Sequence, residues 1–423
     1  MIEKQDILDL VHKYWQSRIK LNKDEVPVSG AVFDASDIVS VVSTVLDGWF
    51  TESKVCDQFR HELCAVTKQR HAVLVNSGSS ANLLAVTAIK DHLEIPDGKL
   101  VITSAVAFPT TVAPIIQNRL VPLFIDIILD NFGYTYEILK ALFKRNDVAG
   151  AILTHTLGFP YAEYAISELA YNNGKFLISD CCDSLSATMD GIPVGNHSDM
   201  ATYSFFPAHH ITSGEGGAVL TNSSKLYRLL QQYSNWGRDC WCEPGQSNTC
   251  NKRFEQEFES LPKGYDHKYT FTKVGYNLKM TEMQGALGLS QIKKLSTFVE
   301  KRIQNYHYLR DKLFGMEEID FVYPEYEFSP FGFPIRVVQE DSAKNLITHL
   351  EKNGIRTRPV FAGNITKHPM MKNVNYVIGE PLYNADEVMN KMFWVGVWPG
   401  LTDMDLDKIV DTIKEYYGGR HEI

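Results

Sequence analysis

An alternation of short apolar runs and helix-like segments between residues 71 and 181 constrains the fold of this chain more than any other feature. The apolar runs predict strands, and the spacing of apolar positions between them predicts helices. Strands that alternate with helices over such a length indicate a largely parallel sheet with helices on both faces, because each crossover between parallel strands needs a helix. The predicted strands cover residues 71–78, 99–108, 120–127, 148–158 and 175–181.

The remainder of the chain divides around this sheet. At 423 residues it is too long for one small domain and suits one large domain with a smaller one. We expect a large α/β domain over residues 1–290 and a smaller C-terminal α+β domain over residues 291–423. The patterns that support this division are helical at 5–20, 37–48, 53–66, 281–314 and 341–353 and strand-like at 331–338 and 354–360.

Charge and apolar pattern exclude several classes of protein. The net charge of −9 argues against broad binding to the phosphate backbone of nucleic acid. The chain lacks the run of about 18 apolar residues that a membrane-spanning helix needs. Its N-terminal segment, MIEKQDILDLVHKYW, is charged and amphipathic, unlike a secretory signal peptide. We therefore expect a cytoplasmic protein with no membrane or nucleic-acid partner, in which thiols stay reduced.

Three stretches that follow predicted strands carry polar side chains suited to chemistry. Ser79 and Ser80 open a helix, where backbone N–H groups and the helix dipole favour a phosphate, although an ordinary helix N-cap is the simpler interpretation. Asp180 ends a strand, at the edge where α/β folds bind ligands, and it also suits an N-cap. His209 and His210 precede the glycine-rich SGEGG, and both metal ligation and general-base work are open for them.

The order of these stretches carries a resemblance to a known family. A strand–Gly–Ser turn, an Asp at a strand end about 100 residues later and the pattern S-F-x-P-x-(K)-x-x-x-x-G-E-G-G resemble the sugar aminotransferase branch of the fold type I pyridoxal-phosphate enzymes. His209 stands where that branch has its lysine. This exchange makes the chain similar to the 3-dehydrases of 3,6-dideoxysugar biosynthesis, the CDP-6-deoxy-L-threo-D-glycero-4-hexulose-3-dehydrase family. The similarity runs through SGSSANLLA, AFPTTV, THTLG, DCCD, PAHHIT, GEGGAV, WGRDC, SLPKGYDHKYT, GYNLKMTEMQ and FAGN.

The resemblance implies an aspartate aminotransferase-like fold and a cofactor held without a covalent bond. Because the lysine is missing, the cofactor is expected as pyridoxamine 5′-phosphate, or as pyridoxal 5′-phosphate charged by an amino donor. His209 is implied as the base, and Asp183 as the residue that positions His209 or the cofactor. The other implied site residues are Gly78, Ser79 and Ser204 at the phosphate, Phe108 on the ring, Asp180 at the pyridine nitrogen, Asn277 from the neighbouring subunit of a homodimer, and Arg358 and Asn364 at the nucleotide or sugar.

Four of the seven cysteines match the spacing of the cluster-bearing members of this family. Intervals of 57, 1 and 7 residues separate them, and Cys181 fails this match by one residue. Four thiolates without a Cys-x-x-Cys pair suit a [2Fe–2S] cluster better than a structural zinc. Four unrelated buried thiols are the alternative, and Cys56 and Cys64 are expected to be packing residues. The implied cluster ligands, with a cluster loop at about 236–270, are Cys182, Cys240, Cys242 and Cys250.

The implied reaction removes the C3 hydroxyl of a nucleotide-linked 4-keto-6-deoxysugar. A partner NAD(P)H-dependent flavin or iron–sulfur reductase would then supply electrons through the cluster, in 3,6-dideoxysugar synthesis for a bacterial surface polysaccharide. A glutamate-driven dehydrase of the colitose type, which needs no reductase, is one alternative, and a non-catalytic cofactor-binding subunit is another. The chain departs from the family at Phe206, where the family usually has a tyrosine, so it lacks the phenol hydroxyl at this position.

Overall fold

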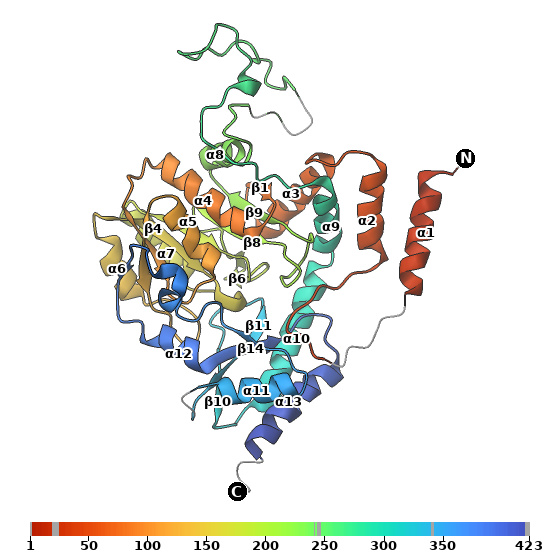
Figure 1. Ribbon diagram of the computed structural model, residues 1–423, viewed down its shortest axis with the longest axis vertical. Helices are drawn as coiled ribbons and strands as arrows, with labels where there is room; N and C mark the ends of the chain where they lie inside the picture. The colour runs from red at the N-terminus through yellow and green to blue at the C-terminus, as the bar shows by residue number, and fades with distance from the viewer. Residues whose placement is uncertain (1, 19–24, 241, 243–246, 340–341, 419–423) are drawn as a thin grey trace.

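An eight-stranded sheet forms the centre of the larger part of the molecule (Figure 1). The computed structural model describes residues 2–18, 25–240, 242, 247–339 and 342–418. Within that part of the chain, the strand order is β1-β9-β8-β5-β4-β2-β3-β13, and β9 alone runs against the other strands. The strands are β1 (His71–Val75), β2 (Leu100–Ser104), β3 (Val121–Ile125), β4 (Val148–Thr154), β5 (Phe176–Asp180), β8 (Met200–Ser204), β9 (Gly217–Thr221) and β13 (Val377–Ile378).

Helices cover both faces of this sheet, as the alternation in the sequence predicts. The helices are α1 (Lys4–Ser17), α2 (Ala35–Leu46), α3 (Lys54–Thr67), α4 (Gly78–His92), α5 (Pro109–Gln117), α6 (Tyr136–Phe143), α7 (Glu163–Asn172), α8 (Ser224–Ser234), α9 (Glu282–Ile292), α10 (Leu295–Leu313), α11 (Lys344–Lys352), α12 (Tyr383–Lys391) and α13 (Asp403–Gly418). Successive side chains of a strand point to opposite faces. On β8, Met200 packs with α4 and α8, whereas Ala201 and Tyr203 pack with α3, α9 and α10. A strand buried on both faces is apolar throughout, which is why its sequence does not alternate.

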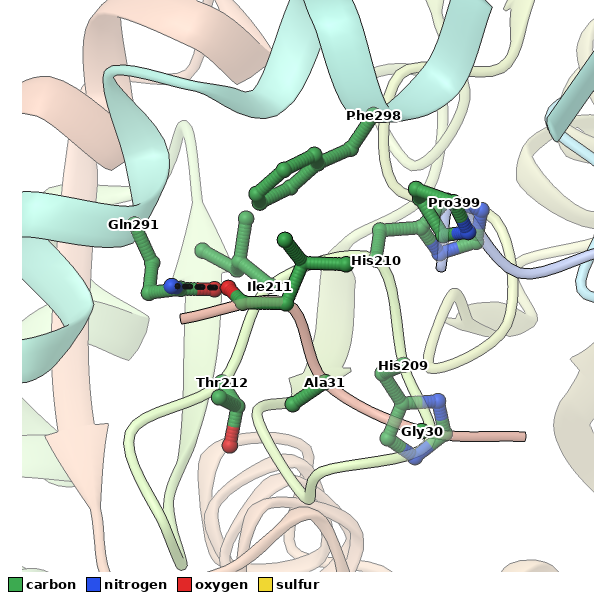
Figure 2. A pocket seen from close by; sticks show the side chains of 10 residues that line it. Gly30, Ala31, His209, His210, Ile211, Thr212, Gln291, Phe298 and Pro399 are labelled. Atoms are coloured by element: carbon green, nitrogen blue, oxygen red, sulfur yellow. Dashed lines mark hydrogen bonds between the residues drawn. The ribbon is translucent and has the colours of Figure 1, made fainter. Parts of the chain in front are cut away.

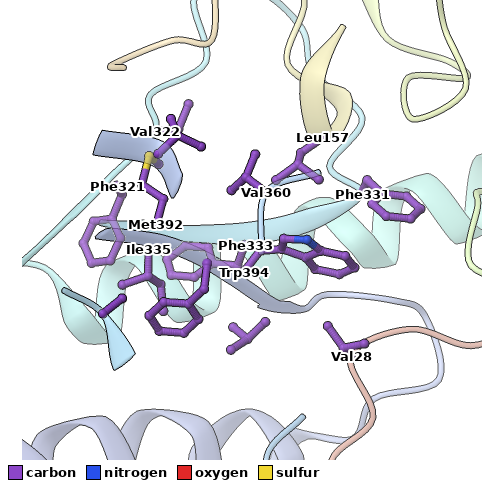
Figure 3. Close-up of a cluster of buried hydrophobic side chains, with 14 of the residues drawn as sticks. Val28, Leu157, Phe321, Val322, Phe331, Phe333, Ile335, Val360, Met392 and Trp394 are labelled. Atoms are coloured by element: carbon purple, nitrogen blue, oxygen red, sulfur yellow. The ribbon is translucent and has the colours of Figure 1, made fainter. Parts of the chain in front are cut away.

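A second, antiparallel sheet of four strands forms the smaller part of the molecule. Its order is β10-β11-β14-β12, and its apolar core is shown in Figure 3. A Cβ on Gly332 would lie 2.3 Å from the Trp394 ring, so glycine lets the indole lie flat across β11. Leu157 and Val28, from distant parts of the chain, complete this core. The strands are β10 (Ile319–Phe321), β11 (Gly332–Val337), β12 (Arg358–Pro359) and β14 (Met392–Gly396).

Two segments join the two sheets across the boundary predicted near residue 290. Val26 pairs with Ile355, so the N-terminal segment lies beside the small sheet. β13 in turn adds to the edge of the large sheet by pairing in parallel with β3. Neither pairing is visible in the sequence, because both join residues hundreds of positions apart. The division at residue 290 stays a prediction.

The segment between α8 and α9 extends away from the sheet, beyond α8 (Figure 1). Its two ends are held by pairing of Asn235 with Asn277 and of Arg238 with Phe271. The predicted cluster loop falls on this segment, but its residues 241 and 243–246 lie outside the described residues, as do residues 19–20 and 341 at the ends of predicted helices. Among the described helices, none has the length and apolar character that a membrane span requires.

Candidate active site

Four strand ends meet at one edge of the large sheet, and several residues singled out from the sequence gather there. β1, β5 and β8 end at this edge, and β9 begins there because it runs the opposite way. Asp180 ends β5, Ser204 ends β8, and Gly217 opens β9 opposite Ser204. The carboxyl ends of parallel strands are the usual ligand-binding edge of an α/β sheet. The sequence-predicted residues on these strands are therefore neighbours in space.

The N-terminus of α4 forms a cradle against β8. The Ser77 hydroxyl caps the helix by accepting the N–H of Ser80 at 3.1 Å. A Cβ on Gly78 would lie 2.5 Å from Cβ of Ser204, so glycine lets the helix approach the strand this closely. Ser79 is exposed in the first turn, where backbone N–H groups have no partner within the helix. Such a terminus suits a phosphate group.

Asp180 is 3% exposed and its carboxylate is fixed by several donors. Its Oδ2 accepts hydrogen bonds from Asn82 Nδ2 and from Thr111 Oγ1, both at 2.8 Å. The Thr202 hydroxyl in turn donates to Asn82 Oδ1 at 2.6 Å, which fixes the amide. Oδ1 of Asp180 accepts the N–H of Cys182 at 3.2 Å. Buried polar groups need such partners, and this carboxylate is oriented to accept a further donor such as a protonated ring nitrogen.

His209 and Asp183 form a pair beside Asp180. Nδ1 of His209 lies 3.3 Å from Oδ1 of Asp183. Burial raises the pKa of Asp183, while the contact with His209 acts in the opposite direction. The Phe331 ring packs against the imidazole, with 5.1 Å between the ring centroids. A carboxylate behind a histidine fixes the orientation of its ring, so the free side of His209 is available for proton transfer.

A buried arginine holds the turn that carries His209. Arg302 of α10 donates to the carbonyls of Ala208 and His209 at 3.1 and 3.0 Å, and to those of Phe331 and Pro330 at 3.1 and 3.4 Å. Burial lowers the pKa of Arg302 to about 10. One side chain thus ties the His209 turn to the segment that leads into the small sheet.

A small cavity lies behind this turn (Figure 2). His210 is buried there, and its Nε2 lies 3.0 Å from the Ser329 carbonyl, while burial lowers the pKa of His210 well below its ordinary value. Gln291 donates to the Val32 carbonyl at 2.9 Å and keeps the N-terminal segment against the turn. The contacts of His210 are thus structural. The cavity is lined by Gly30, Ala31, Val32, His209, His210, Ile211, Thr212, Gln291, Phe298 and Pro399.

Phe108 and Asn277 are exposed, which fits ligand contacts better than packing. Phe108 is 52% exposed at the start of α5, and its centroid lies 6.4 Å from that of Phe361. Asn277 lies near the C-terminal end of the α8–α9 segment, and its Oδ1 accepts a hydrogen bond from Lys279 at 2.8 Å. The adjacent Leu278 carbonyl accepts the N–H of Asn76, just beyond β1. The roles of Phe108 on a ring and of Asn277 across a subunit boundary stay predictions.

The two predicted substrate residues differ in their surroundings. Arg358 is exposed on β12, and its guanidinium donates to the Thr357 carbonyl at 2.7 Å. Asn364 is 2% exposed, donates to Asp386 Oδ1 at 2.7 Å and accepts the N–H of Thr366. The amide of Asn364 therefore already holds its own turn. Contact of either residue with the substrate stays a prediction.

The described cysteines are all free, and they lie in three different environments. Cys182 lies at the sheet edge, with its thiol 4.0 Å from the Thr202 carbonyl of β8. On the α8–α9 segment, Cys242 donates its N–H to Cys240 Sγ at 3.5 Å, and Cys250 Sγ lies 3.5 Å from a histidine ring. No three His, Cys, Asp or Glu side chains of the described ranges stand ready around one point to hold a metal ion.

The remaining cysteines lie among apolar side chains. Cys181 is fully buried between the sheet and the helices α3 and α9, and burial raises the pKa of its thiol far above the ordinary value. Cys56 is fully buried too and donates to the Thr281 carbonyl at 3.3 Å. A Cβ on Gly285 would lie 2.5 Å from Cys56 Sγ. These thiols fill space, as the sequence predicts for Cys56.

Comparison with known proteins assigns most of the chain to one family. The model of the DegT/DnrJ/EryC1/StrS aminotransferase family matches residues 33–414. This protein belongs to that family. Membership of the DegT/DnrJ/EryC1/StrS family identifies it as a pyridoxal-phosphate-dependent enzyme of nucleotide-sugar metabolism. The predicted fold type I architecture, with its mostly parallel mixed sheet, is confirmed.

Two curated relatives and one solved structure illustrate the similarity. The chain is 44% identical to dTDP-4-dehydro-2,6-dideoxy-D-glucose 3-dehydratase of Saccharopolyspora spinosa, over 92% of this chain and 86% of that protein. It is 42% identical to lipopolysaccharide biosynthesis protein RfbH of Salmonella typhimurium, over 93% and 92%. The structure of Escherichia coli GDP-4-keto-6-deoxy-D-mannose-3-dehydratase with bound hydrated PLP superposes with a TM-score of 0.83 at 26% identity, covering 92% and 99% of the chains.

Sequence reasoning missed the residues that support the site. Asn82, Thr111 and Thr202 hold Asp180, and Arg302 holds the His209 turn. Each is a buried polar residue within a helix or strand of the structure. A polar side chain on the buried face of an element is the signal that could have found them, because such a group needs a partner.

Proposed function

We propose that this protein removes the C3 hydroxyl of a nucleotide-linked 4-keto-6-deoxysugar and that a reduction completes the deoxygenation. The observation that carries the proposal is His209, which stands at the position of the lysine of the aminotransferases. Its Nδ1 lies 3.3 Å from Oδ1 of Asp183. A chain without that lysine cannot anchor the cofactor covalently, which argues against ordinary transamination. The names of the curated relatives as 3-dehydratases support the same reaction.

The sheet edge fits pyridoxamine or pyridoxal phosphate. The α4 cradle of Gly78, Ser79 and Ser204 would hold the phosphate, and Asp180 would accept the proton of the ring nitrogen. The exposed Phe108 ring would stack on the cofactor. When bound, the cofactor supplies an amine for the C4 ketone of the sugar and a ring that withdraws electrons.

His209 is the residue that moves the proton. An imidazole can accept a proton and return it, and Asp183 keeps the ring oriented. Phe206 offers no hydroxyl, so His209 is also the group of this turn that can protonate the leaving C3 hydroxyl. In this proposal, His209 therefore serves first as the base and then as the acid.

The second half of the proposed function is the reduction. One water leaves C3, and two electrons and two protons enter, so the net change replaces the hydroxyl by hydrogen. An NAD(P)H-dependent flavin or iron–sulfur reductase would supply the electrons, and a [2Fe–2S] cluster held by the spaced cysteines would pass them on one at a time. The support for a cluster is the spacing of Cys182, Cys240, Cys242 and Cys250 in the sequence. The product would serve 3,6-dideoxysugar synthesis for a surface polysaccharide.

The test combines the full-length protein, purified without oxygen, with pyridoxamine phosphate and a panel of CDP-, dTDP- and GDP-linked 4-keto-6-deoxysugars. NAD(P)H and a ferredoxin–flavin reductase pair complete the reaction, and mass spectrometry follows the sugars. We expect a product with one oxygen atom fewer, formed only when the reductase is present. Equal product from glutamate without reductase would show the colitose-type reaction instead. Tight cofactor binding with no sugar consumed would identify a non-catalytic subunit.

A further inference from the structure

The turn Thr156–Gly158 follows β4 and supports one wall of the His209 site. The Leu157 carbonyl accepts the N–H of Phe331 at 2.9 Å, and Figure 3 shows these two side chains at one end of the core of the small sheet. The Phe331 ring packs against the His209 imidazole. A shift of the turn would therefore move the ring that borders this imidazole.

The same turn lies against Asp183, the carboxylate that faces His209. A Cβ on Gly158 would lie 2.8 Å from the Asp183 carbonyl oxygen, so the backbones of the two segments are in close contact. Burial raises the pKa of Asp183, whereas a hydrogen bond from the Leu157 backbone acts in the opposite direction. The position of the turn therefore affects where this carboxylate lies.

Leu157 has an unfavourable backbone conformation in this turn. Its φ of 51° and ψ of 25° lie in the left-handed region, which residues with a Cβ seldom adopt. Such a conformation persists only where the surrounding structure enforces it, and it occurs preferentially at functional sites. The residues that hold the turn in this conformation are therefore expected to matter for the site.

A buried histidine and glutamate fix the start of the turn. His155 and Glu163 are both 0% exposed, and Nε2 of the histidine lies 3.5 Å from Oε2 of the glutamate. Nδ1 of His155 accepts the N–H of Tyr161 at 3.3 Å, so the neutral ring has its proton on Nε2, toward Glu163. The imidazole stacks on the Tyr161 ring with 4.2 Å between the centroids. The His155 N–H donates to the Asp180 carbonyl at 3.1 Å, so ring and backbone are both fixed.

Glu163 is itself held in place at the first position of α7. Its Oε2 accepts the N–H of Gly195 at 2.6 Å, and its Oε1 accepts the N–H of Ser198 at 3.1 Å. Burial raises the pKa of Glu163, but its contacts with His155 and Gly195 outweigh this effect and keep the pKa below its ordinary value. The carboxylate therefore stays charged and attracts the Nε2 proton of His155.

We propose that His155 and Glu163 are positioning residues for the proton transfer at His209. Glu163 fixes the imidazole of His155, which keeps the following turn in its left-handed conformation. The turn in turn places Asp183 and Phe331 against His209. The inference rests on the proposed function, because it concerns the base of that reaction. The alternative is that the imidazole of His155 only fills space beside a tyrosine ring.

Two amide replacements of His155 separate these roles. A glutamine places its amide nitrogen near the position of Nε2 and keeps a donor toward Glu163, whereas an asparagine reaches only as far as Nδ1 and loses that donor. In the full-length protein with cofactor, reductase and sugar nucleotide, His155→Asn should lower kcat roughly tenfold to a hundredfold at an unchanged KM. His155→Gln should recover most of this loss.

His71→Asn is the matched control for these kinetics. The His71 ring also stacks on a tyrosine, with 4.6 Å between its centroid and that of Tyr227, but it lies at the start of β1, away from the active-site edge. This variant should keep the kcat of the wild type. An equal loss of kcat in His155→Asn and His155→Gln would overturn the proposal, because it would show that only the volume and stacking of the imidazole matter.

Crystal structures of the His155 variants give a second test that needs no substrate. In His155→Asn, Leu157 should leave the left-handed region, and the distance of 3.3 Å between Nδ1 of His209 and Oδ1 of Asp183 should lengthen. His155→Gln should keep both features. A His155→Asn structure with both features unchanged would overturn the proposal.

Circular dichroism checks that each variant is folded. If His155→Asn does not fold, Glu163→Gln is measured in the same two ways and should show the same loss of kcat and the same structural changes. An unchanged site in that variant would equally overturn the proposal. A wild type that dehydrates no sugar would refute the proposed function, whereas the structures would still decide whether His155 and Glu163 position His209.

Discussion

The two adjacent histidines of the active-site turn have opposite surroundings. His209 is partly exposed and faces Asp183, whereas His210 is buried against the Ser329 carbonyl. The turn therefore presents one imidazole to the sheet edge and uses the other to hold its own backbone. This difference in burial, rather than the residue type, separates the base from the structural residue.

The exchange His209→Asn should abolish loss of the C3 hydroxyl and leave cofactor binding intact. An asparagine keeps a polar side chain of similar size but cannot accept a proton, and general acid–base catalysis contributes about 10²–10⁴-fold. Product formation by mass spectrometry and cofactor binding by absorbance are the two measurements. His61→Asn on the exposed face of α3 is the matched control. Retained turnover in His209→Asn would refute its role as base.

The exchange Asp183→Asn should lower activity. It should also make the protein more stable relative to the wild type as the pH rises. Burial raises the pKa of Asp183, so the folded chain holds this proton more tightly than the unfolded chain. The wild type therefore loses stability as pH rises from the unfolded value, about 3.9, through the raised folded value. The Asp183→Asn variant does not lose this stability, because its amide does not titrate in this pH range.

Chemical denaturation of both proteins over a pH series measures this difference. The free energy of unfolding of Asp183→Asn relative to the wild type should increase through that window and then stay constant. A difference that is flat with pH would contradict the raised pKa. Activity should fall roughly tenfold or more, because His209 loses the carboxylate that orients it.

At the N-terminus of α4, Gly78 allows close packing against β8, and the adjacent Ser79 is expected to bind the cofactor phosphate. Gly78→Ala should destabilise the fold by about 1–3 kcal/mol, because its Cβ would meet Ser204 at 2.5 Å. Ser79→Ala should leave the unfolding temperature unchanged and weaken cofactor binding roughly tenfold, the loss expected for a hydrogen bond to a charged phosphate. Thermal unfolding and cofactor titration measure the two effects. A Gly78→Ala protein as stable as the wild type would show that helix and strand are not packed as described.

The elements of the sheet could be predicted from the sequence, and the supports of the site could not. Each predicted strand from 71 to 181 has a counterpart, because buried parallel strands are apolar throughout. Asp180 was found because it ends a predicted strand, and His209 because it precedes the glycine-rich SGEGG and stands where the family has its lysine. Arg302 and Asn82 were missed because their partners lie far away in the chain. β13 was missed for the same reason, since two residues pairing with a distant strand leave no periodic pattern.

For the whole molecule, the exposed Asn277 makes a homodimer with shared sites testable. Mixing and refolding two inactive variants, His209→Asn and Asn277→Asp, should restore part of the activity. A mixed dimer in which Asn277 crosses to the partner would carry both defects in one site and none in the other. Each variant refolded alone is the control. If no activity returns although mixed dimers form, each site uses the Asn277 of its own chain.

Arg302 connects the His209 turn to the small sheet through hydrogen bonds. Its guanidinium bonds to four carbonyls, two in the His209 turn and two just before β11. Carbonyls that share one buried cation are not free to move apart, since separation would leave them without a partner. A rotation of the small sheet therefore carries the backbone of His209 with it. A sugar nucleotide that bound against the small sheet and moved it would therefore also move the His209 imidazole. Substrate binding and proton transfer would then be coupled through Arg302.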